Sequence, residues 1–437
     1  MAEISPQPDA ATITDTPPQR TSAVTTAESP SEQTSAGTIA ETSVRETPAI
    51  AATKTPFGQQ TSIPSTSTDI FPVQNRAVVT TETPLQQNLS PNIQEVSQAQ
   101  FDDAAAQAET HIEASEGQST DGDDGYETDS ASSCSTSVTS SVREYAFENG
   151  RRYHKFRQGA YVLPNDDAEQ DREDMKHAMV LAVCGNKLHY APIGDDPQSI
   201  IDLGTGTGIW AMEMGDTYPS AEITGVDLSP IQPQWVPPNV KFLVDDVESP
   251  WLYPPDYFDL VHARHTVMAF KNWDKVLSEA YDHIKPGGFF EFQELFYHAS
   301  CDDQSMPHHY AFSQYLSYIK EGLGIFGVDL HATLALPNRL KVAGFVDVQE
   351  RIIKIPIGTW PRNRLLKRVG LYLQAVIMDG LQGIALGPMC RGLGWSPESV
   401  EVFLADVRKS LRDSSVHSYY SLHIIYGRKP QWRGAGY

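Results

Sequence analysis

Three glycines at two-residue intervals follow a short apolar run and form the strongest candidate for a ligand-binding loop. The run Ser199–Leu203 has the composition of a buried strand, and a predicted helix follows the glycines. Glycine lets the backbone approach a ligand closely, and an acid at the strand end can bind a positively charged group. The predicted contacts of this loop are Asp202, Gly204, Thr205, Gly206 and Gly208.

The glycine spacing favours one of two cofactors. A nicotinamide dinucleotide binds to a G-x-G-x-x-G loop whose backbone amides hold two phosphates, whereas this chain has Ile209 in place of the third glycine. S-adenosylmethionine has no phosphate and carries an ammonium and a sulfonium, which suit Asp202. We therefore predict S-adenosylmethionine as the cofactor. The alternative, a nicotinamide dehydrogenase, does not fit this spacing.

Acidic residues after the next two predicted strands have positions that suit the rest of this cofactor. A carboxylate at the end of the second strand can bind both ribose hydroxyls. After the third strand, one of two consecutive aspartates can accept from the adenine amino group, and a valine can lie on the ring. The sequence leaves open which aspartate does so. The predicted contacts are Asp227, Leu228, Asp245, Asp246 and Val247.

Basic residues at the end of the fourth predicted strand are the catalytic candidates, namely His262, Arg264 and His265. Methyl transfer mainly requires alignment of the acceptor, and a base is needed only where the acceptor must lose a proton. Histidine titrates near neutral pH and can take this proton. The simpler alternatives are that His262 packs within the sheet and that Arg264 pairs with a carboxylate.

Several further residues are weaker candidates. Tyr153 and Tyr161 either fold over the cofactor as a lid or are ordinary core aromatics. Glu291 and Glu294 lie on or just past the fifth predicted strand. The segment from Cys301 to the pair His308-His309 matches no known spacing of metal ligands, so we predict no metal site.

Alternating strands and helices must position these residues. This alternation predicts an α/β fold with a doubly wound parallel sheet over residues 199–437. Two insertions, at about 297–336 and 355–415, are expected to cap a cleft at the carboxyl ends of the strands. The predicted strands are 200–204, 222–227, 240–244, 258–262, 289–295, 346–353 and 418–426, and the predicted helices are 209–216, 273–284, 338–343, 364–378 and 397–411.

The first third of the chain differs in composition from the rest. Residues 1–140 are rich in Ser, Thr and Pro and carry 20 acidic against 4 basic residues, which predicts a disordered tail whose removal leaves the fold intact. Residues 141–198 are predicted to form a helical lid, with a helix over Glu169–Cys184 that buries Met175, Ala178, Met179 and Ala182 on one face.

The overall composition excludes several classes of protein. The net charge of −23 argues against nucleic acid as a direct partner, because like charges repel. The chain shows no signal peptide, no run of about 20 apolar residues and no disulfide or zinc spacing among its four cysteines. We expect an intracellular protein of the cytoplasm, the nucleus or both, without a membrane span.

The motifs together resemble the fungal LaeA-like methyltransferases, a branch of the class I enzymes that use S-adenosylmethionine. The matching segments are Glu148-Asn-Gly-Arg-Arg-Tyr-His-Lys-Phe, Tyr161-Val-Leu-Pro-Asn-Asp-Asp, the glycine loop, Gly225-Val-Asp-Leu-Ser-Pro-Ile-Gln-Pro-Gln-Trp, Lys285-Pro-Gly-Gly, Gly358-Thr-Trp-Pro and Gly427-Arg-Lys-Pro. The similarity covers about residues 145–430 and leaves out the acidic tail.

The resemblance implies the seven-stranded class I sheet, a Rossmann-like fold, with its last strand antiparallel. It also implies a role in fungal secondary metabolism, with a small molecule or a protein as methyl acceptor. The alternative is a scaffold that binds S-adenosylmethionine and acts through velvet-type regulatory proteins with little or no catalysis. The shared cofactor motifs do not distinguish these roles.

Overall fold

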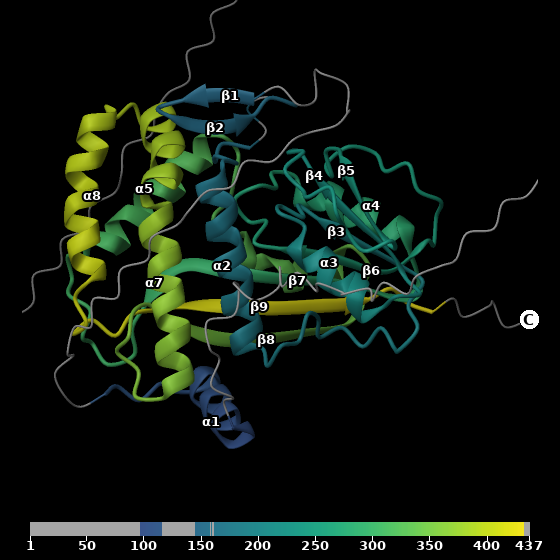
Figure 1. Ribbon diagram of the computed structural model, residues 1–437, viewed down its shortest axis with the longest axis horizontal. Coiled ribbons are helices and arrows are strands. Elements are labelled where there is room, and N and C mark those ends of the chain that lie inside the picture. Colours follow the sequence, from purple (N-terminus) through teal and green to yellow (C-terminus); the bar gives the residue numbers. More distant parts are fainter. Residues whose placement is uncertain (1–96, 116–144, 158, 160, 432–437) are drawn as a thin grey trace, which may run out of the picture. The chain divides into compact units, whose positions relative to one another are not determined.

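A seven-stranded sheet forms the centre of the protein in the computed structural model, which describes residues 97–115, 145–157, 159 and 161–431 (Figure 1). The strand order is β5-β4-β3-β6-β7-β9-β8, and only β9 runs antiparallel to its neighbours. This confirms the predicted doubly wound class and the antiparallel last strand. The strands are β3 (Ser199–Leu203), β4 (Glu222–Asp227), β5 (Val240–Val244), β6 (Phe258–Arg264), β7 (Ile284–Ser300), β8 (Val346–Pro356) and β9 (Tyr419–Arg428).

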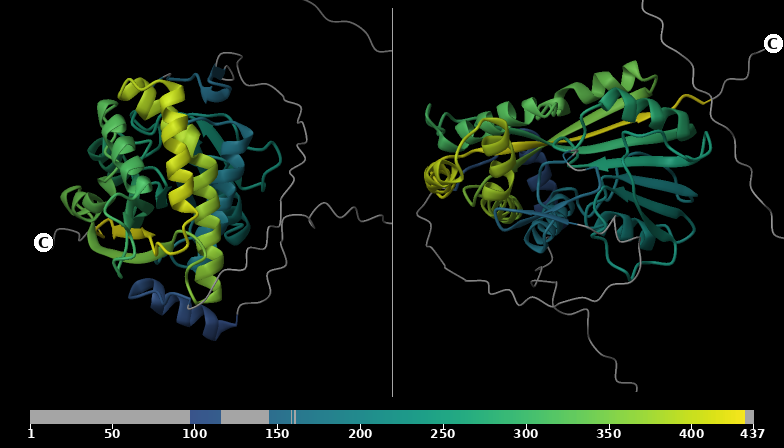
Figure 2. Two further views of the ribbon diagram at one scale, coloured as in Figure 1. Left: turned by 90° about the vertical axis from the view of Figure 1, so that its left-hand side faces the viewer. Right: turned by 90° about the horizontal axis from the view of Figure 1, so that it is seen from above.

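Helices cover both faces of this sheet, as the right-hand view of Figure 2 shows. One face carries α2 (Asp167–Val183) and α3 (Ile209–Thr217), which contact each other, and the other carries α4 (Trp273–His283) and α6 (Leu336–Val342). Because both faces are covered, a strand such as β3 is buried at all five of its residues.

The two predicted insertions form a helical cap beside the sheet. The first contains α5 (Ala311–Ile325), and the second contains α7 (Arg364–Ala385) and α8 (Pro397–Leu411). Figure 1 shows these helices at the end to which β7 runs, and hence at the carboxyl ends of the parallel strands. The cap therefore lies over the edge where ligands of such sheets bind.

Helix α7 and the π-helical turn after it, Arg364–Gly392, pass the length and composition test for a membrane-spanning helix. However, α7 packs against α2, β8 and α8, and 56% of its most apolar window is buried within the protein. Its apolar residues therefore belong to the core of the cap.

The N-terminal lid differs in part from its prediction. It begins with a two-stranded hairpin, β1 (Tyr145–Glu148) and β2 (Arg151–His154), and becomes helical only at α2. The turn of the hairpin places Asn149 and Gly150 at φ angles of 51° and 76°, which suits an Asn-Gly turn between paired strands.

The predicted disorder of residues 1–140 is wrong for residues 97–115, and the rest of that segment lies outside the described residues. Helix α1 (Gln98–Glu109) begins with a capping box at Ser97 and packs against β8 and α7. Ala104, Ala108 and Ile112 are buried in the main core. The polar composition hid this helix because small alanines make up most of its buried face.

We expect Ile112→Ala to lower the free energy of unfolding by about 2–5 kcal/mol, because the side chain is 4% exposed and its removal leaves a cavity. The measurement is urea denaturation of the full-length protein. Val402→Ala, at a position that is 74% exposed, is the control and should change little. Equal stability of the two variants would show that the segment 97–115 does not contribute to the stability of the fold.

Candidate cofactor and methyl-transfer site

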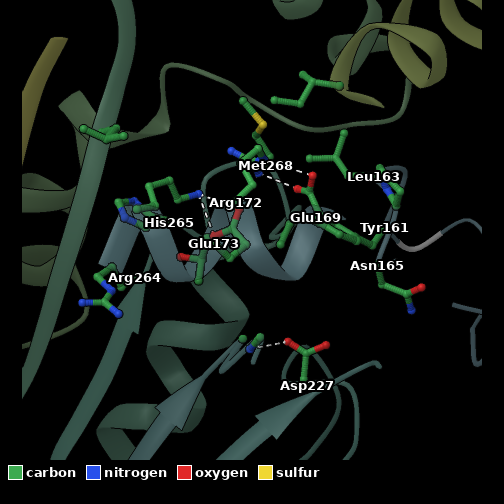
Figure 3. Close-up of a pocket in the computed structure, with 18 of the residues that line it drawn as sticks. Tyr161, Leu163, Asn165, Glu169, Arg172, Glu173, Asp227, Arg264, His265 and Met268 are labelled. Atoms are coloured by element: carbon green, nitrogen blue, oxygen red, sulfur yellow. Dashed lines mark hydrogen bonds and ion pairs between the residues drawn. The ribbon is translucent and has the colours of Figure 1, made fainter. Parts of the chain in front are cut away.

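A large cavity lies at the carboxyl edge of the sheet, beneath the helical cap (Figure 3). It encloses about 1610 Å³ of empty space, part of it open to solvent. Of the residues predicted from the sequence, it is lined by Tyr161, Gly204, Gly206, Asp227, Leu228, Asp245, Asp246, Val247, Arg264 and His265. Asp202 and Thr205 line a smaller adjoining pocket, together with Gly204, Gly206 and Arg264.

The glycine loop lines this cavity, and hydrogen bonds to neighbouring residues fix its conformation. Gly206 has a φ angle of 58°, and a Cβ atom built on it would have no neighbour within 4 Å. Its N–H donates to Asp227 Oδ2 over 2.9 Å, and its carbonyl accepts from the Gln232 amide over 2.7 Å. Thr207 donates to Asp174 of α2 over 2.7 Å. The sequence analysis did not single out Gln232, although it lies in the distinctive Ser-Pro-Ile-Gln-Pro segment.

Gly208 lines neither pocket, and its role is to shape the start of α3. Its φ angle is 83°, and a Cβ atom there would lie 2.3 Å from the Phe242 ring. The third glycine therefore allows close packing of the helix on β5 rather than contact with a ligand.

Asp227 lies in the cavity wall with both carboxylate oxygens directed by backbone amides. Oδ2 accepts from Gly206 N–H, and Oδ1 accepts from Ser229 N–H over 2.8 Å. Burial raises the pKa of this carboxyl, and the two amide hydrogen bonds oppose that shift. Since each oxygen keeps a further lone pair, the carboxylate can still accept from two hydroxyls of a ligand.

The two candidate aspartates for adenine differ in their surroundings. Asp246 forms an ion pair with Arg157 over 2.7 Å and accepts from Glu248 N–H. Asp245 is exposed, and its N–H donates to the Asp227 carbonyl. Both residues line the cavity beside Val247, so the choice between them stays open.

His262 is not placed for catalysis, which corrects the prediction. Its ring stacks on Trp210 at 3.7 Å between centroids, and Nδ1 lies 2.8 Å from Asp202 Oδ1. Complete burial lowers the pKa of His262 to about 4, so the ring is neutral at pH 7. It lines neither pocket and instead positions Asp202, whose other oxygen accepts from Thr205 over 2.6 Å.

Arg264 and His265 both reach the cavity. Arg264 donates to His177 Nδ1 over 2.6 Å, whereas its Nη1 is buried without a hydrogen-bond partner among the described residues. His265 adopts a φ angle of 58°, which is uncommon for a residue other than glycine, and neither ring nitrogen has a partner in the described part of the chain. Burial, and then the nearby cation Lys176, hold the pKa of His265 well below its usual value.

Helix α2 contributes four charged side chains that the sequence analysis missed. Arg172 donates to both Glu169 oxygens, over 2.5 and 3.0 Å, and also contacts Glu173 (Figure 3). Lys176 pairs with Glu173 over 2.8 Å. All four line the cavity. Their spacing of three and four residues along the helix was visible in the sequence, but it is also typical of an exposed helix face.

The two tyrosines of the proposed lid separate. Tyr161 lines the cavity, whereas Tyr153 does not. Instead, the Arg391 guanidinium carbon lies over the Tyr153 ring, 5.8 Å from the ring centroid. Of the two alternatives for Tyr153, its burial and its pairing opposite Ala146 in the hairpin favour an ordinary core aromatic. Among the described residues no group of His, Cys, Asp or Glu could hold a metal ion.

Glu291 and Glu294 are buried and fix the chain near the site rather than lining the cavity. Glu294 accepts from the N–H and hydroxyl of Thr266, next to His265, over 2.8 and 2.5 Å. Glu291 accepts from the N–H groups of Tyr190 and Ala191. Burial raises the pKa of each carboxyl to about 7.

We expect Glu294 to make stability fall as the pH rises. Between its ordinary pKa of 4.5 and its folded pKa of about 7, the folded state retains a proton that the unfolded state releases. The stabilisation is therefore complete below pH 4.5 and is lost as the pH rises through 7. Relative to Glu294→Gln, the unmodified protein should lose about 2–3 kcal/mol between pH 5 and pH 8, as measured by urea denaturation.

The exposed Glu321→Gln variant is the control for this pH dependence. It should follow the unmodified protein at every pH. If Glu294→Gln also followed it, the Glu294 carboxyl would not titrate in this range.

Comparison with known proteins agrees with this geometry. A family model described as "Methyltransferase domain" matches residues 175–348. The methyltransferase pytC of Aspergillus terreus is 36% identical over 307 residues, which span 69% of this chain and 93% of that protein. The secondary metabolism regulator LAE1 of Cochliobolus heterostrophus is 35% identical, over 65% of this chain and 94% of that protein. The protein-methionine methyltransferase laeA of Emericella nidulans is 32% identical, over 67% of this chain and 79% of that protein.

The strand order, the antiparallel β9 and the glycine loop at the carboxyl edge define a class I methyltransferase fold. The chain belongs to the fungal family of S-adenosylmethionine-dependent methyltransferases that contains pytC and the secondary metabolism regulators LAE1 and laeA.

Proposed function

We propose that the chain is an active methyltransferase that acts in fungal secondary metabolism or in its regulation. The observation that carries this proposal is the continuity of one cavity, which runs from the glycine loop to the space beneath the cap. A cofactor at the loop and an acceptor beneath the cap would share this cavity, as a direct transfer between them requires.

The residues around the loop fit S-adenosylmethionine. Asp227 would bind the ribose hydroxyls beside Leu228, and Val247 would lie on the adenine ring with Asp245 or Asp246 at its amino group. Gly204, Thr205 and Gly206 would face the amino-acid portion of the cofactor. All of these line the cavity or its adjoining pocket.

Two side chains of opposite charge suit the amino-acid portion, which is a zwitterion. Arg264 has a buried N–H without a partner in the described part of the chain, and that N–H could donate to the carboxylate. Glu173 lines the same adjoining pocket and could accept from the ammonium. Asp202 was predicted for this ammonium, and each of its oxygens keeps a lone pair beyond its bond with Thr205 or His262. Asp202 therefore remains our assignment for the ammonium, with Glu173, which already pairs with Arg172 and Lys176, as the alternative.

When bound, the cofactor supplies an electrophilic methyl group with a neutral leaving group. The chain's own part is to hold the acceptor in line, to exclude water beneath the cap and to accept a proton. His265 is the residue we assign to proton acceptance, since it lines the cavity and its ring nitrogens have no partner among the described residues.

The test is transfer of radiolabelled methyl from S-adenosylmethionine into a fractionated fungal extract by the full-length protein. We expect label in an acceptor, and less label with Asp227→Ala at the same cofactor concentration. Cofactor binding without any labelled product would instead favour the scaffold role with velvet-type partners. The same extract, separated into cytoplasm and nucleus, would locate the acceptor.

A further inference from the structure

The cavity extends past the glycine loop into a space that the two insertions enclose. We call this part the acceptor chamber and define it by Phe312, Tyr315 and Ile319 of α5, Leu373 and Ile377 of α7, and Tyr420 of β9. These residues line the same cavity as Gly204, Gly206 and Asp227, so the space beside the glycine loop continues beneath the cap.

The walls of the acceptor chamber are mainly apolar, and their polar atoms are hydroxyls. Tyr315 donates to the Leu381 carbonyl over 3.2 Å, and Tyr297 of β7 also lines the cavity. Burial raises the pKa of Tyr297, Tyr315 and Tyr420, so these hydroxyls stay protonated and uncharged. An occupant would thus meet rings, aliphatic side chains and neutral hydroxyl groups.

Four charged side chains of α2 line the same cavity and pair with one another. On α2, Arg172 pairs with Glu169 and Lys176 pairs with Glu173, so two cations meet two carboxylates. Arg264 faces the adjoining pocket, where the proposed cofactor carboxylate would balance it. A charged acceptor would lose its hydration without gaining a free counter-charge, which is costly in an apolar site.

We propose that the acceptor chamber binds a neutral, mainly apolar small molecule that contains rings, and that a hydroxyl oxygen of this molecule receives the methyl group. This rests on the proposed function. The bond between sulfur and the methyl carbon breaks with its electron pair left on sulfur. The hydroxyl oxygen forms the new bond to carbon, and its proton passes to a ring nitrogen of His265.

A polypeptide acceptor fits the chamber less well. Each peptide unit brings an N–H and a carbonyl that need hydrogen-bond partners, and apolar walls offer few. Residues of α5, α7 and β9 line the chamber on several sides, which suits a compact ligand better than an extended chain.

The test uses 2-naphthol as the probe, because its fluorescence reports transfer from water to an apolar site. We expect 2-naphthol to bind the full-length protein without cofactor. Ile377→Trp should weaken this binding by about tenfold or more by filling the chamber, and Leu373→Trp, on the same helix and also lining the chamber, should do likewise. Leu371→Trp is the matched control on α7, because Leu371 is 49% exposed, and it should bind as the unmodified protein does.

Charge and fold are tested in the same series. Naphthalene-2-sulfonate and 2-naphthylmethylammonium should each bind about tenfold more weakly than 2-naphthol. Calorimetry with S-adenosylmethionine should give the same affinity for the two chamber variants as for the unmodified protein. That result would show that both variants are folded.

Unchanged 2-naphthol affinity in both chamber variants, tighter binding of either ion, or radiolabel found only in protein would overturn the proposal. If S-adenosylmethionine binds but 2-naphthol does not, the acceptor class is wrong and the proposed function stands. If 2-naphthol binds but S-adenosylmethionine does not, the proposed function fails instead.

Discussion

Arg172→Met should lower the free energy of unfolding by about 3–5 kcal/mol, as measured by urea denaturation. The Arg172 side chain is 6% exposed and donates to Glu169, which is equally buried, and to Glu173. Methionine keeps most of the side-chain volume but leaves Glu169 without its closest cation, whereas Glu173 keeps Lys176. The loss is large because an unpaired charge in a buried site costs more than the pair contributes.

Two further variants separate this effect from general damage. Adding Glu169→Gln to Arg172→Met should recover part of the stability, since it removes the buried carboxylate that has lost its closest cation. Lys241→Met breaks an ion pair with Glu222 in which both side chains are more than 40% exposed, and it should cost less than about 1 kcal/mol. If Arg172→Met cost no more than Lys241→Met, the network on α2 would not stabilise the fold.

Asp227→Ala should weaken S-adenosylmethionine binding by about 1–3 kcal/mol, which is a factor of about 5 to 150 in the dissociation constant. The carboxylate is the one acidic side chain of the described residues that holds Gly206 N–H and lines the cavity. Its loss removes the proposed ribose hydrogen bonds and also loosens the loop. Calorimetry measures the affinity directly.

Asp227→Asn helps to separate these two contributions. The amide oxygen can still accept from Gly206 N–H, so the loop should keep its conformation and the affinity should fall less. Asp216→Ala, at an exposed position on α3, is the control and should bind as the unmodified protein does. Unchanged affinity in Asp227→Ala would mean that the cofactor site has been misplaced.

The sequence predicts the sheet well because its strands are short apolar runs separated by helices and turns. Runs such as Glu222–Asp227 and Val240–Val244 have the same bounds in the prediction and in the structure. Glycine spacing locates the ligand loop for a related reason, since positive φ angles at Gly204 and Gly206 need that residue type. Both features are local, and local patterns are what a single sequence displays.

The parts that the sequence did not reveal depend on distant contacts. Helix α2 was predicted to bury Met175 and Ala178, but Ala178 is exposed and the buried face carries Arg172 and Lys176. A charged helix face is usually predicted to be exposed to solvent, and the sequence alone does not show that α7 packs against this one. His262 likewise has the residue type of a base, and only the stacked Trp210 ring shows that it is structural.

The central claim is that the cavity binds S-adenosylmethionine at the glycine loop, and calorimetry with S-adenosylmethionine and with NAD on the full-length protein tests it most directly. The geometry predicts one S-adenosylmethionine site per chain and no NAD binding, because the loop has Ile209 where a dinucleotide loop has its third glycine. Tight NAD binding without S-adenosylmethionine binding would contradict the claim.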